Sequence, residues 1–311
     1  MVIYDLIIIG AGPAGLTAGI YGSRSGLETL ILEQGMPGGS VAKSPFIENY
    51  PGFPEGISGP DLIERMLKQC EKFGAEIKML EEVIELNLQG KRMIVKTEKN
   101  RYSAKAIIIA SGSHHRKLNV PGEDRLRGVG VSYCALCDGA FFKDLKVLVV
   151  GGGNAAATSA LYLSHIASHV TLVHRRDALR AEQILLDEML KRGVTIFWNT
   201  EVKEIAGKEK VRSVVLYNNK TGKMWNEEVD GVFIAVGEVP NSELARNAGV
   251  KVDKNGYIIV DSRQRTNVPG VYAAGDVTNY PVKQIGTAVG QGIIAAVEAY
   301  GFVKRPYYYE G

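Results

Sequence analysis

The sequence predicts an α/β protein with two doubly wound domains, each built on a parallel sheet. The chain has 311 residues, more than the roughly 100–200 residues of a single domain. Two stretches share the order apolar strand, glycine-rich turn, helix, strand: "IYDLIIIGAGPAGLTAGIYGSRSGLETLILE" and "LKVLVVGGGNAAATSALYLSHIASHVTLVHRR". That order is typical of a parallel βαβ unit. The 36 glycines exceed the average share of about 7% and indicate tight turns or backbone that approaches ligands.

Composition excludes several classes of protein. The 45% hydrophobic and 23% charged residues are ordinary for a globular chain, and a net charge of +3 with interspersed Lys and Arg does not predict nucleic-acid binding. No apolar run approaches the roughly 20 residues of a membrane span. Three cysteines cannot form a secreted disulfide framework, and the N-terminus lacks the features of a signal peptide. We therefore expect a cytoplasmic protein without nucleic-acid or membrane partners.

The first βαβ unit favours a dinucleotide site. Gly10, Gly12 and Gly15 follow the first strand, where a pyrophosphate approaches the amides at a helix N-terminus and a Cβ atom would obstruct it. Glu33 ends the next strand, where a carboxylate accepts hydrogen bonds from ribose hydroxyls, so the ligand carries no 2′-phosphate. Close packing of strand and helix is the alternative explanation for these glycines.

The second βαβ unit has the opposite electrostatic character. Its second strand ends in a basic group instead of an acid: His174, Arg175, Arg176 and Arg180. Guanidinium groups fit a 2′-phosphate through charge-assisted hydrogen bonds, although a solvated basic helix start would look similar. The two units together suggest one bound flavin dinucleotide and one nicotinamide dinucleotide that exchanges. A later strand, "VPGVYAAGDVT", ends in Gly275-Asp276 before a helix, where an aspartate can hold a cofactor hydroxyl.

A pair of cysteines stands in "SYCALCDGAFF", and Asp138 follows the second of them. In a reducing compartment such a pair is redox-active or binds metal rather than forming a permanent disulfide. The alternatives are half a zinc site or two inert core cysteines. Zinc needs about four ligands, and neither a second cysteine pair nor a histidine in ligand spacing accompanies this one. The third cysteine, Cys70, has the spacing of a core residue on an amphipathic helix.

Seven segments, in this order, carry a resemblance to a known family: "GAGPAG", "IENYPGFPEGISGPDL", "IASGSHHRKLNVPGE", "GVSYCALCDGAFF", "GGGNAA", "HRRDALRA" and "GVYAAGDVTNYPVKQIGTAVGQG". The chain resembles the low-molecular-weight thioredoxin reductases of the pyridine nucleotide-disulfide oxidoreductase superfamily over nearly its whole length. The resemblance implies two Rossmann-like domains, the second inserted in the first. Residues 1–113 and 243–311 would bind FAD, and residues 114–242 would bind NADPH and carry the cysteines. "SGSHHRK" and "VGEVPNSE", which include His114 and His115, are expected to be flexible loops at the two crossings.

The resemblance also assigns roles to residues. For FAD it implies Gly10, Gly12, Pro13, Ala14, Gly15, Glu33, Gly39, Asn49, Gly112, Gly275, Asp276, Gln284 and Ile285. For NADPH it implies Gly151, Gly153, Asn154, Ala155, His174, Arg175, Arg176 and Arg180. Cys134 and Cys137 would be the redox dithiol, with Cys137 facing the flavin, Cys134 attacking the partner disulfide and Asp138 acting as general acid and base. The implied enzyme is an NADPH-dependent thioredoxin-disulfide reductase, a homodimer acting on a thioredoxin-like protein and binding no metal.

Other functions stay open on the sequence alone. Ser40 and Asn154 depart from the family pattern near the two nucleotides, so NADH, ferredoxin or a reduced deazaflavin is an alternative donor. A glutaredoxin-like protein or a peroxidase is an alternative acceptor. A non-catalytic sensor of the NADP redox state is a third possibility, which the dithiol beside Asp138 disfavours.

Overall fold

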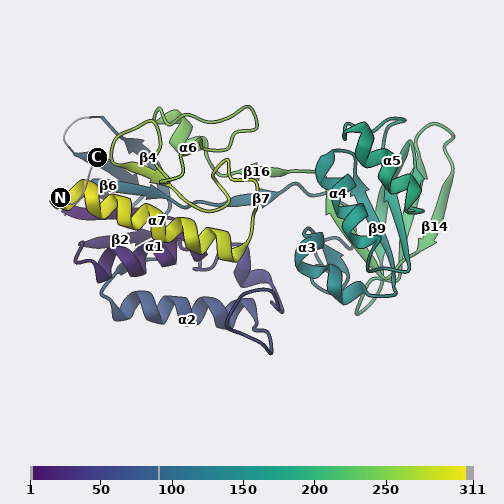
Figure 1. Ribbon diagram of the computed structural model, residues 1–311, viewed down its shortest axis with the longest axis horizontal. Helices are drawn as coiled ribbons and strands as arrows, with labels where there is room; N and C mark the ends of the chain where they lie inside the picture. The colour runs from purple at the N-terminus through teal and green to yellow at the C-terminus, as the bar shows by residue number, and fades with distance from the viewer. Residues whose placement is uncertain (1–2, 90–91, 306–311) are drawn as a thin grey trace. The chain divides into compact units, whose positions relative to one another are not determined.

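The structure is a computed structural model that describes residues 3–89 and 92–305. It contains two compact units (Figure 1): one holds the chain up to His114 and from Val239 onward, and the other is His115–Glu238. Each unit has its own mainly parallel sheet, so the predicted α/β class with an inserted second unit is confirmed. The chain passes between the units at 114/115 and 238/239, whereas the sequence placed the crossings at 113/114 and 242/243.

The sheet of the first unit is parallel at its centre and antiparallel at one edge. Strand β6 pairs with β1 along one side. On its other side, the first half of its nine residues pairs with β5 and the second half pairs with β17. The strand order is β3(Glu76–Lys78), β2(Thr29–Leu32), β1(Ile3–Ile9), β6(Arg101–Ile109), β5(Met93–Thr97) and β4(Val83–Asn87), with β17(Val271–Ala273) beside the end of β6.

Alternation along β1 gives this sheet a core on each face. Leu6 and Ile8 point to the face that is covered by the long helices, and Ile7 and Ile9 point to the opposite face. Helix α1 lies between α7 and α2 in Figure 1, and short elements cover the other face. The helices of this unit are α1(Pro13–Arg24), η1(Val41–Lys43), α2(Gly59–Lys72), α6(Glu243–Asn247) and α7(Ile285–Lys304).

The second unit repeats the plan with a smaller parallel sheet. Its helices pack on one face around Phe233 and Met189, and an antiparallel three-stranded sheet covers the other face. The parallel sheet runs β11(Thr195–Phe197), β10(His169–Val173), β9(Lys146–Gly151), β15(Gly231–Ala235), β8(Val131–Ser132), and the covering sheet runs β12(Thr200–Ala206), β13(Ser213–Asn218), β14(Met224–Glu228). The helices are α3(Ala135–Asp138), η2(Gly139–Phe142), α4(Asn154–Leu163) and α5(Gln183–Lys191).

Each of the two crossing segments, which were expected to be flexible loops, contains a strand of three residues at its centre. β7(Ser113–His115) pairs with β16(Glu238–Pro240) in a sheet of two strands. Nδ1 of His115 lies 3.2 Å from Oε1 of Glu238, and the amide of Arg116 donates to the carbonyl of Gly237 at 2.9 Å. Only three residues of each segment are paired, too few for an alternating pattern to be visible in the sequence.

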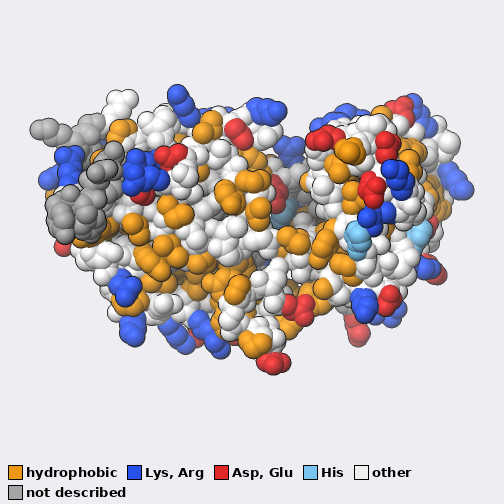
Figure 2. All heavy atoms as spheres, viewed as in Figure 1, with side chains coloured by type: hydrophobic (Ala, Val, Ile, Leu, Met, Phe, Trp, Pro, Cys, Tyr) orange, Lys and Arg blue, Asp and Glu red, His pale blue; other side chains and the backbone are white. Residues whose placement is uncertain are grey.

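Cys70 lies fully buried in α2, which confirms its prediction as a core residue. Burial raises the pKa of its thiol to about 12, so it stays protonated and unreactive at neutral pH. No helix within the described residues is long and apolar enough to cross a membrane. On the face seen in Figure 2, cationic and anionic side chains are interspersed within each unit.

Candidate active site

The glycine turn that opens α1 is a cradle with room for a phosphate. Gly12 is the N-cap of α1, no side chain caps this end, and a Cβ atom added at Gly12 would meet nothing within 4 Å. At Gly15 an added Cβ would lie 1.9 Å from the carbonyl oxygen of Gly10, and at Gly10 it would lie 2.4 Å from that of Ala110. Gly10 and Gly15 therefore let β1, β6 and α1 approach, while Gly12 leaves helix amides open to a ligand.

Glu33 is fixed at the end of β2 beside this turn. Its carboxylate accepts the amide hydrogens of Ala11 at 2.8 Å and of Gly35 at 2.9 Å. Its own amide and carbonyl bond to the carbonyl of Lys78 and the amide of Glu81. The carboxylate is thus held at the place where the ribose of a dinucleotide lies when its phosphates rest on the helix N-terminus.

Glu81 anchors the segment that supports Glu33. The Glu81 side chain is buried and accepts hydrogen bonds from Thr97, Asn100 and the Tyr102 hydroxyl. Burial acts to raise the pKa of this carboxyl, but the three hydrogen bonds outweigh it and lower the pKa, so the group is charged at neutral pH. Sequence reasoning missed Glu81 because its partners are 16 to 21 residues away.

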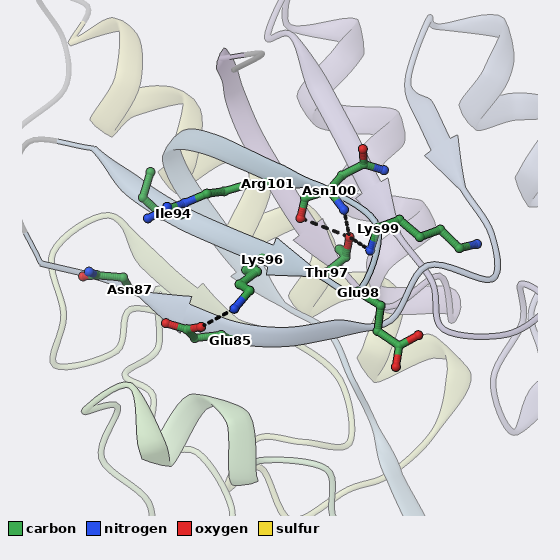
Figure 3. Close-up of a pocket in the computed structure, with 9 residues that line it drawn as sticks. All are labelled: Glu85, Asn87, Ile94, Lys96, Thr97, Glu98, Lys99, Asn100 and Arg101. Carbon is green, nitrogen blue, oxygen red and sulfur yellow. Dashed lines mark hydrogen bonds and ion pairs between the residues drawn. The ribbon is translucent and has the colours of Figure 1, made fainter.

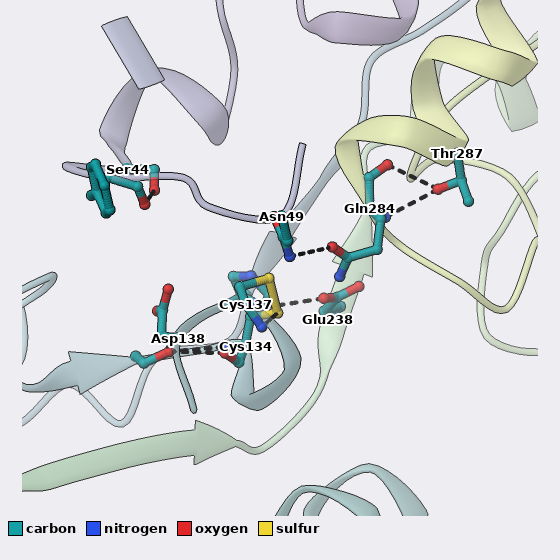
Figure 4. Close-up of a disulfide and its surroundings, with 11 residues drawn as sticks. Ser44, Asn49, Cys134, Cys137, Asp138, Glu238, Gln284 and Thr287 are labelled. Atoms are coloured by element: carbon teal, nitrogen blue, oxygen red, sulfur yellow. Dashed lines mark hydrogen bonds and ion pairs between the residues drawn. A yellow bond between two sulfur atoms is a disulfide. The ribbon is translucent and has the colours of Figure 1, made fainter. Parts of the chain in front are cut away.

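Of the other residues predicted for the flavin, Gly39 and Gly275 lie beside this turn, and Asn49 and Gln284 meet at the start of α7. Gly39 approaches Gly12, with 3.8 Å between its added Cβ and the Gly12 Cα, and an added Cβ at Gly275 would lie 3.0 Å from the Ala14 Cβ. Asn49 donates to the Gln284 side chain at 3.4 Å, and Gln284 caps α7 together with Thr287 (Figure 4). Pro13 begins α1, Ile285 begins α7, and the positive φ angles of Gly39, Gly112 and Gly275 suit glycine.

The second glycine turn has the same construction at the start of α4. Gly153 is the N-cap, and an added Cβ there would meet nothing within 4 Å, whereas one at Gly151 would lie 2.4 Å from the carbonyl oxygen of Ala235. Asn154 and Glu182 exchange two hydrogen bonds of 2.9 Å, which tie the turn to the loop before α5. The Arg180 amide donates to the Gly152 carbonyl at 2.7 Å in the same loop. This cradle also has room for a pyrophosphate.

The basic group beside this turn divides into two kinds of residue. Arg175, Arg176 and Arg180 have exposed side chains. His174 is buried, and an added Cβ at Gly152 would lie 2.1 Å from its ring. Burial lowers the pKa of His174, assisted by the charges of Arg176 and Arg180 and opposed by nearby backbone carbonyls, so the ring is neutral at pH 7. The arginines supply the positive charge, and the buried ring of His174 packs against Gly152 in the glycine turn.

Cys134 and Cys137 form a disulfide at the start of α3, with 2.09 Å between the sulfurs (Figure 4). Cys134 is the N-cap, and the Cys137 amide donates to its sulfur at 3.1 Å. Both cysteines are half-buried. A hydrogen-bond donor aimed at Sγ of Cys134 stabilises the thiolate that forms when the bond is reduced. The pair is therefore suited to dithiol–disulfide exchange.

Asp138 ends α3 next to the disulfide, as the sequence indicated. Burial raises the pKa of its carboxyl, while a hydrogen bond from Ser132 and the charge of Arg127 act in the opposite direction. A carboxyl with a raised pKa exchanges protons closer to neutral pH than an exposed aspartate does. Asp138 can therefore supply and remove the protons that accompany reduction and oxidation of the two sulfurs.

Comparisons with known proteins agree with this geometry. A profile of the pyridine nucleotide-disulphide oxidoreductases matches residues 4–292. The thioredoxin reductases of Listeria innocua and Bacillus subtilis are 48% and 47% identical, and each match covers 97% of this chain and 95% or 96% of the relative. A crystal structure of thioredoxin reductase from Streptococcus pyogenes is 45% identical with a TM-score of 0.93, covering 98% of this chain and 99% of that chain. The chain belongs to the thioredoxin reductase family.

Membership of the thioredoxin reductase family implies a flavin and a pyridine nucleotide, and the two cradles fit such groups. Gly12 and Gly153 each leave space at a helix N-terminus that a Cβ atom would fill. Glu33 offers carboxylate oxygens beside the first cradle, and the arginines offer positive charge beside the second. The two cradles therefore differ in the charge beside them, although the folds of the two units are alike.

Tyr133, which directly precedes Cys134, and Glu123, which holds its hydroxyl, were not predicted from the sequence. The Tyr133 ring stacks on His115 with 4.9 Å between centroids, and the Arg127 guanidinium lies 5.0 Å from the centroid of the Tyr133 ring. The Tyr133 hydroxyl donates to the buried Glu123 carboxylate at 2.6 Å. Glu123 also accepts the amides of Leu118 and Asn119. This group fixes the residue before Cys134, and a tyrosine directly before the first cysteine is the one signal that could have indicated it.

A hollow of about 440 Å³ lies on the antiparallel edge of the first unit (Figure 3). It is lined by residues of β4, β5 and β6, among them Lys96 and Glu85, which pair with each other at 3.2 Å. None of the residues predicted for a cofactor or for catalysis lines this hollow. It is a feature of the β-meander and not part of the candidate active site.

Proposed function

We propose that the protein is a flavin-dependent thioredoxin reductase that passes electrons from NADPH, by way of FAD, to the Cys134–Cys137 disulfide and then to a thioredoxin-like protein. The observation that carries this proposal is the disulfide at the start of α3 with the half-buried carboxyl of Asp138 at the end of the same turn. A chain of this family with such an exchange centre reduces disulfides. The relatives named above are thioredoxin reductases, which favours thioredoxin over a glutaredoxin-like protein or a peroxidase.

FAD, when bound, supplies the chemistry that joins a hydride donor to a two-electron acceptor. The residues that would hold it are the α1 turn, Glu33, Gly39, Asn49 and Gly112, together with Gly275, Asp276, Gln284 and Ile285. Glu33 accepts from two amides in the present structure and has acceptor capacity left for ribose hydroxyls. A carboxylate at this position disfavours a 2′-phosphate, so we assign the flavin dinucleotide to the first unit.

The cysteines carry out the exchange in two balanced steps. Two electrons and two protons break the Cys134–Cys137 bond and give two thiols. One thiolate then attacks the partner disulfide, forms a mixed disulfide and releases a partner thiolate; the second cysteine displaces the remaining partner sulfur and closes the intramolecular bond again. Asp138 holds one proton at a time and passes each proton between the solvent and the sulfurs, donating in the first step and accepting in the second. By family resemblance, Cys134 attacks the partner and Cys137 faces the flavin.

An anaerobic titration of the purified protein with NADPH, and separately with NADH, tests the cofactors of this proposal. We expect a yellow protein whose visible flavin absorbance is bleached by NADPH at low stoichiometry and by NADH far less readily. A yellow protein that neither nucleotide bleaches would leave the disulfide chemistry but exclude the nicotinamide donor. A colourless protein that does not take up FAD would contradict the flavin assignment.

Replacing both Arg175 and Arg176 with Ala is expected to remove the preference for NADPH over NADH. Guanidinium groups form charge-assisted hydrogen bonds with phosphate, so the KM for NADPH should rise about tenfold or more while the KM for NADH stays unchanged. Steady-state kinetics with both nucleotides measure the effect. Arg192→Ala is the matched control, because Arg192 is also an exposed arginine of the second unit but pairs with Glu188 at 3.0 Å. An unchanged KM for NADPH would show that Arg175 and Arg176 do not bind the 2′-phosphate.

The assembly and location of the protein remain predictions. The resemblance implies a homodimer in the cytoplasm, and sedimentation of the purified holoprotein and fractionation of cells would test each expectation. Neither is needed for the chemistry of the cysteines, since the disulfide, Asp138 and its neighbours belong to one chain.

A further inference from the structure

The hydroxyl of Ser132 forms hydrogen bonds with both the Cys134 backbone amide and the Asp138 carboxylate. Ser132 is the last residue of β8 and is buried, with 4% of its surface exposed. Its Oγ lies 2.6 Å from Oδ2 of Asp138, accepts the amide hydrogen of Cys134 at 3.1 Å, and lies 3.3 Å from the Cys134 carbonyl oxygen. A hydroxyl has one hydrogen to donate, and the shortest contact, to an acceptor that carries charge, is the strongest. The hydrogen is therefore directed to Asp138.

This arrangement holds both ends of α3. The amide of Cys134, at the N-cap, donates to Ser132, and Asp138, at the last residue of the helix, accepts from it. The Asp138 amide in turn donates to the Cys134 carbonyl at 3.1 Å. The side chain of Asp138 consequently has its orientation fixed relative to the first cysteine, and the fixing group comes from a strand of the sheet rather than from the short helix itself.

The other groups around Asp138 contribute little competing charge. Arg127 is the charged group that acts on it. Helix α4 packs against α3 and carries one ionisable side chain, that of Tyr162, which would be 2.9 Å from a Cβ added at Gly139. The neighbouring turn η2 has the sequence GAFF and carries none. Burial raises the pKa of Asp138 and the Ser132 hydrogen bond opposes that effect, so removal of the hydroxyl favours the protonated carboxyl further.

We infer that Ser132 is a positioning residue for the disulfide exchange, acting through Asp138. The inference rests on the proposed function, in which Asp138 transfers the protons of the exchange. Ser132 orients the carboxylate and stabilises its charged form. A hydrogen bond to a charged group is worth more than one between neutral groups, so its loss should be visible in the rate and in the pH dependence.

The test compares Ser132→Ala with Ser132→Thr, which keeps the hydroxyl. The infrared carboxyl band of protonated Asp138, identified by its absence in Asp138→Asn, is followed against pH in the reduced holoprotein. We expect its titration midpoint to move to higher pH in Ser132→Ala and to stay near that of the wild type in Ser132→Thr. Thioredoxin reduction near neutral pH should slow about tenfold in Ser132→Ala and recover largely in Ser132→Thr. Bleaching of the flavin by NADPH should not change.

Ser103→Ala is the matched control, because Ser103 is an equally buried serine of the first unit whose Oγ has no hydrogen-bond partner among the described residues. An unchanged midpoint in Ser132→Ala, or a Thr variant no better than the Ala variant, would overturn the inference. If the wild-type protein did not reduce thioredoxin but the midpoint still moved in Ser132→Ala, the proposed acceptor would be wrong and the link between Ser132 and Asp138 would stand.

Discussion

Replacing Cys137 with Ser is expected to abolish reduction of a protein disulfide and to leave reduction of the bound flavin by NADPH intact. The exchange needs two sulfurs, because the mixed disulfide with the partner is resolved only by the second cysteine. A serine side chain is similar in size, and the hydrogen bond that caps α3 uses the backbone amide of residue 137 as donor and the Cys134 sulfur as acceptor, so α3 and the fold should persist. Stopped-flow absorbance of the flavin and an assay of thiols released from thioredoxin report the two half-reactions separately.

Cys70→Ala provides the control for this substitution. Cys70 is buried in α2 of the other unit with a thiol pKa of about 12, so its replacement should leave thioredoxin turnover near that of the wild type. Continued reduction of thioredoxin by the Cys137→Ser variant, at a rate comparable to the wild type, would show that another group performs the exchange.

Replacing Gly12 with Ala should yield a folded protein that has lost its flavin. The φ angle of Gly12 is −76°, which any residue adopts, and an added Cβ meets no atom of the chain within 4 Å. The methyl group would instead occupy the cradle at the N-terminus of α1, where the pyrophosphate rests. We expect less than about a tenth of the wild-type flavin content, with an apoprotein free energy of unfolding within about 1 kcal/mol of the wild-type apoprotein.

Gly15→Ala and Gly290→Ala distinguish this effect from damage to the fold. A Cβ added at Gly15 lies 1.9 Å from the Gly10 carbonyl oxygen, so overpacking should cost the apoprotein about 1–3 kcal/mol or more. Gly290, in α7, has open space like Gly12 and should tolerate alanine with its flavin retained. Denaturant unfolding and visible absorbance measure both quantities. Full flavin content in the Gly12→Ala protein would contradict the claim that the pyrophosphate rests against Gly12.

The parts of the site that sequence predicts well are those whose requirement is local. A glycine turn between an apolar strand and a helix is contained within a few consecutive residues, so the residue pattern alone places Gly12 and Gly153 at helix N-termini. The same holds for Cys134 and Cys137, which begin a helix and are followed directly by Asp138. Local spacing and chemistry decide these positions.

The supporting residues depend on contacts that are distant in the chain or have no distinctive pattern. Tyr133 packs against His115, and Glu81 is held by Tyr102 from a different strand. His174 looked like one more cation of the basic group, and only the structure reveals that its ring is buried beneath Gly152. Ser132 stands close in sequence to the cysteines, but a serine at the end of a strand gives no sign that its hydroxyl is aimed at a carboxylate.

The most direct test of the central claim is to mix the holoprotein, NADPH and an oxidised thioredoxin in the absence of oxygen and to measure both NADPH consumed and thiols formed. The account predicts continuous turnover in which each NADPH oxidised yields one reduced thioredoxin disulfide. It also predicts that this turnover requires Cys134 and Cys137. Consumption of NADPH without formation of thioredoxin thiols, or no consumption in the presence of a protein that carries its flavin, would contradict it.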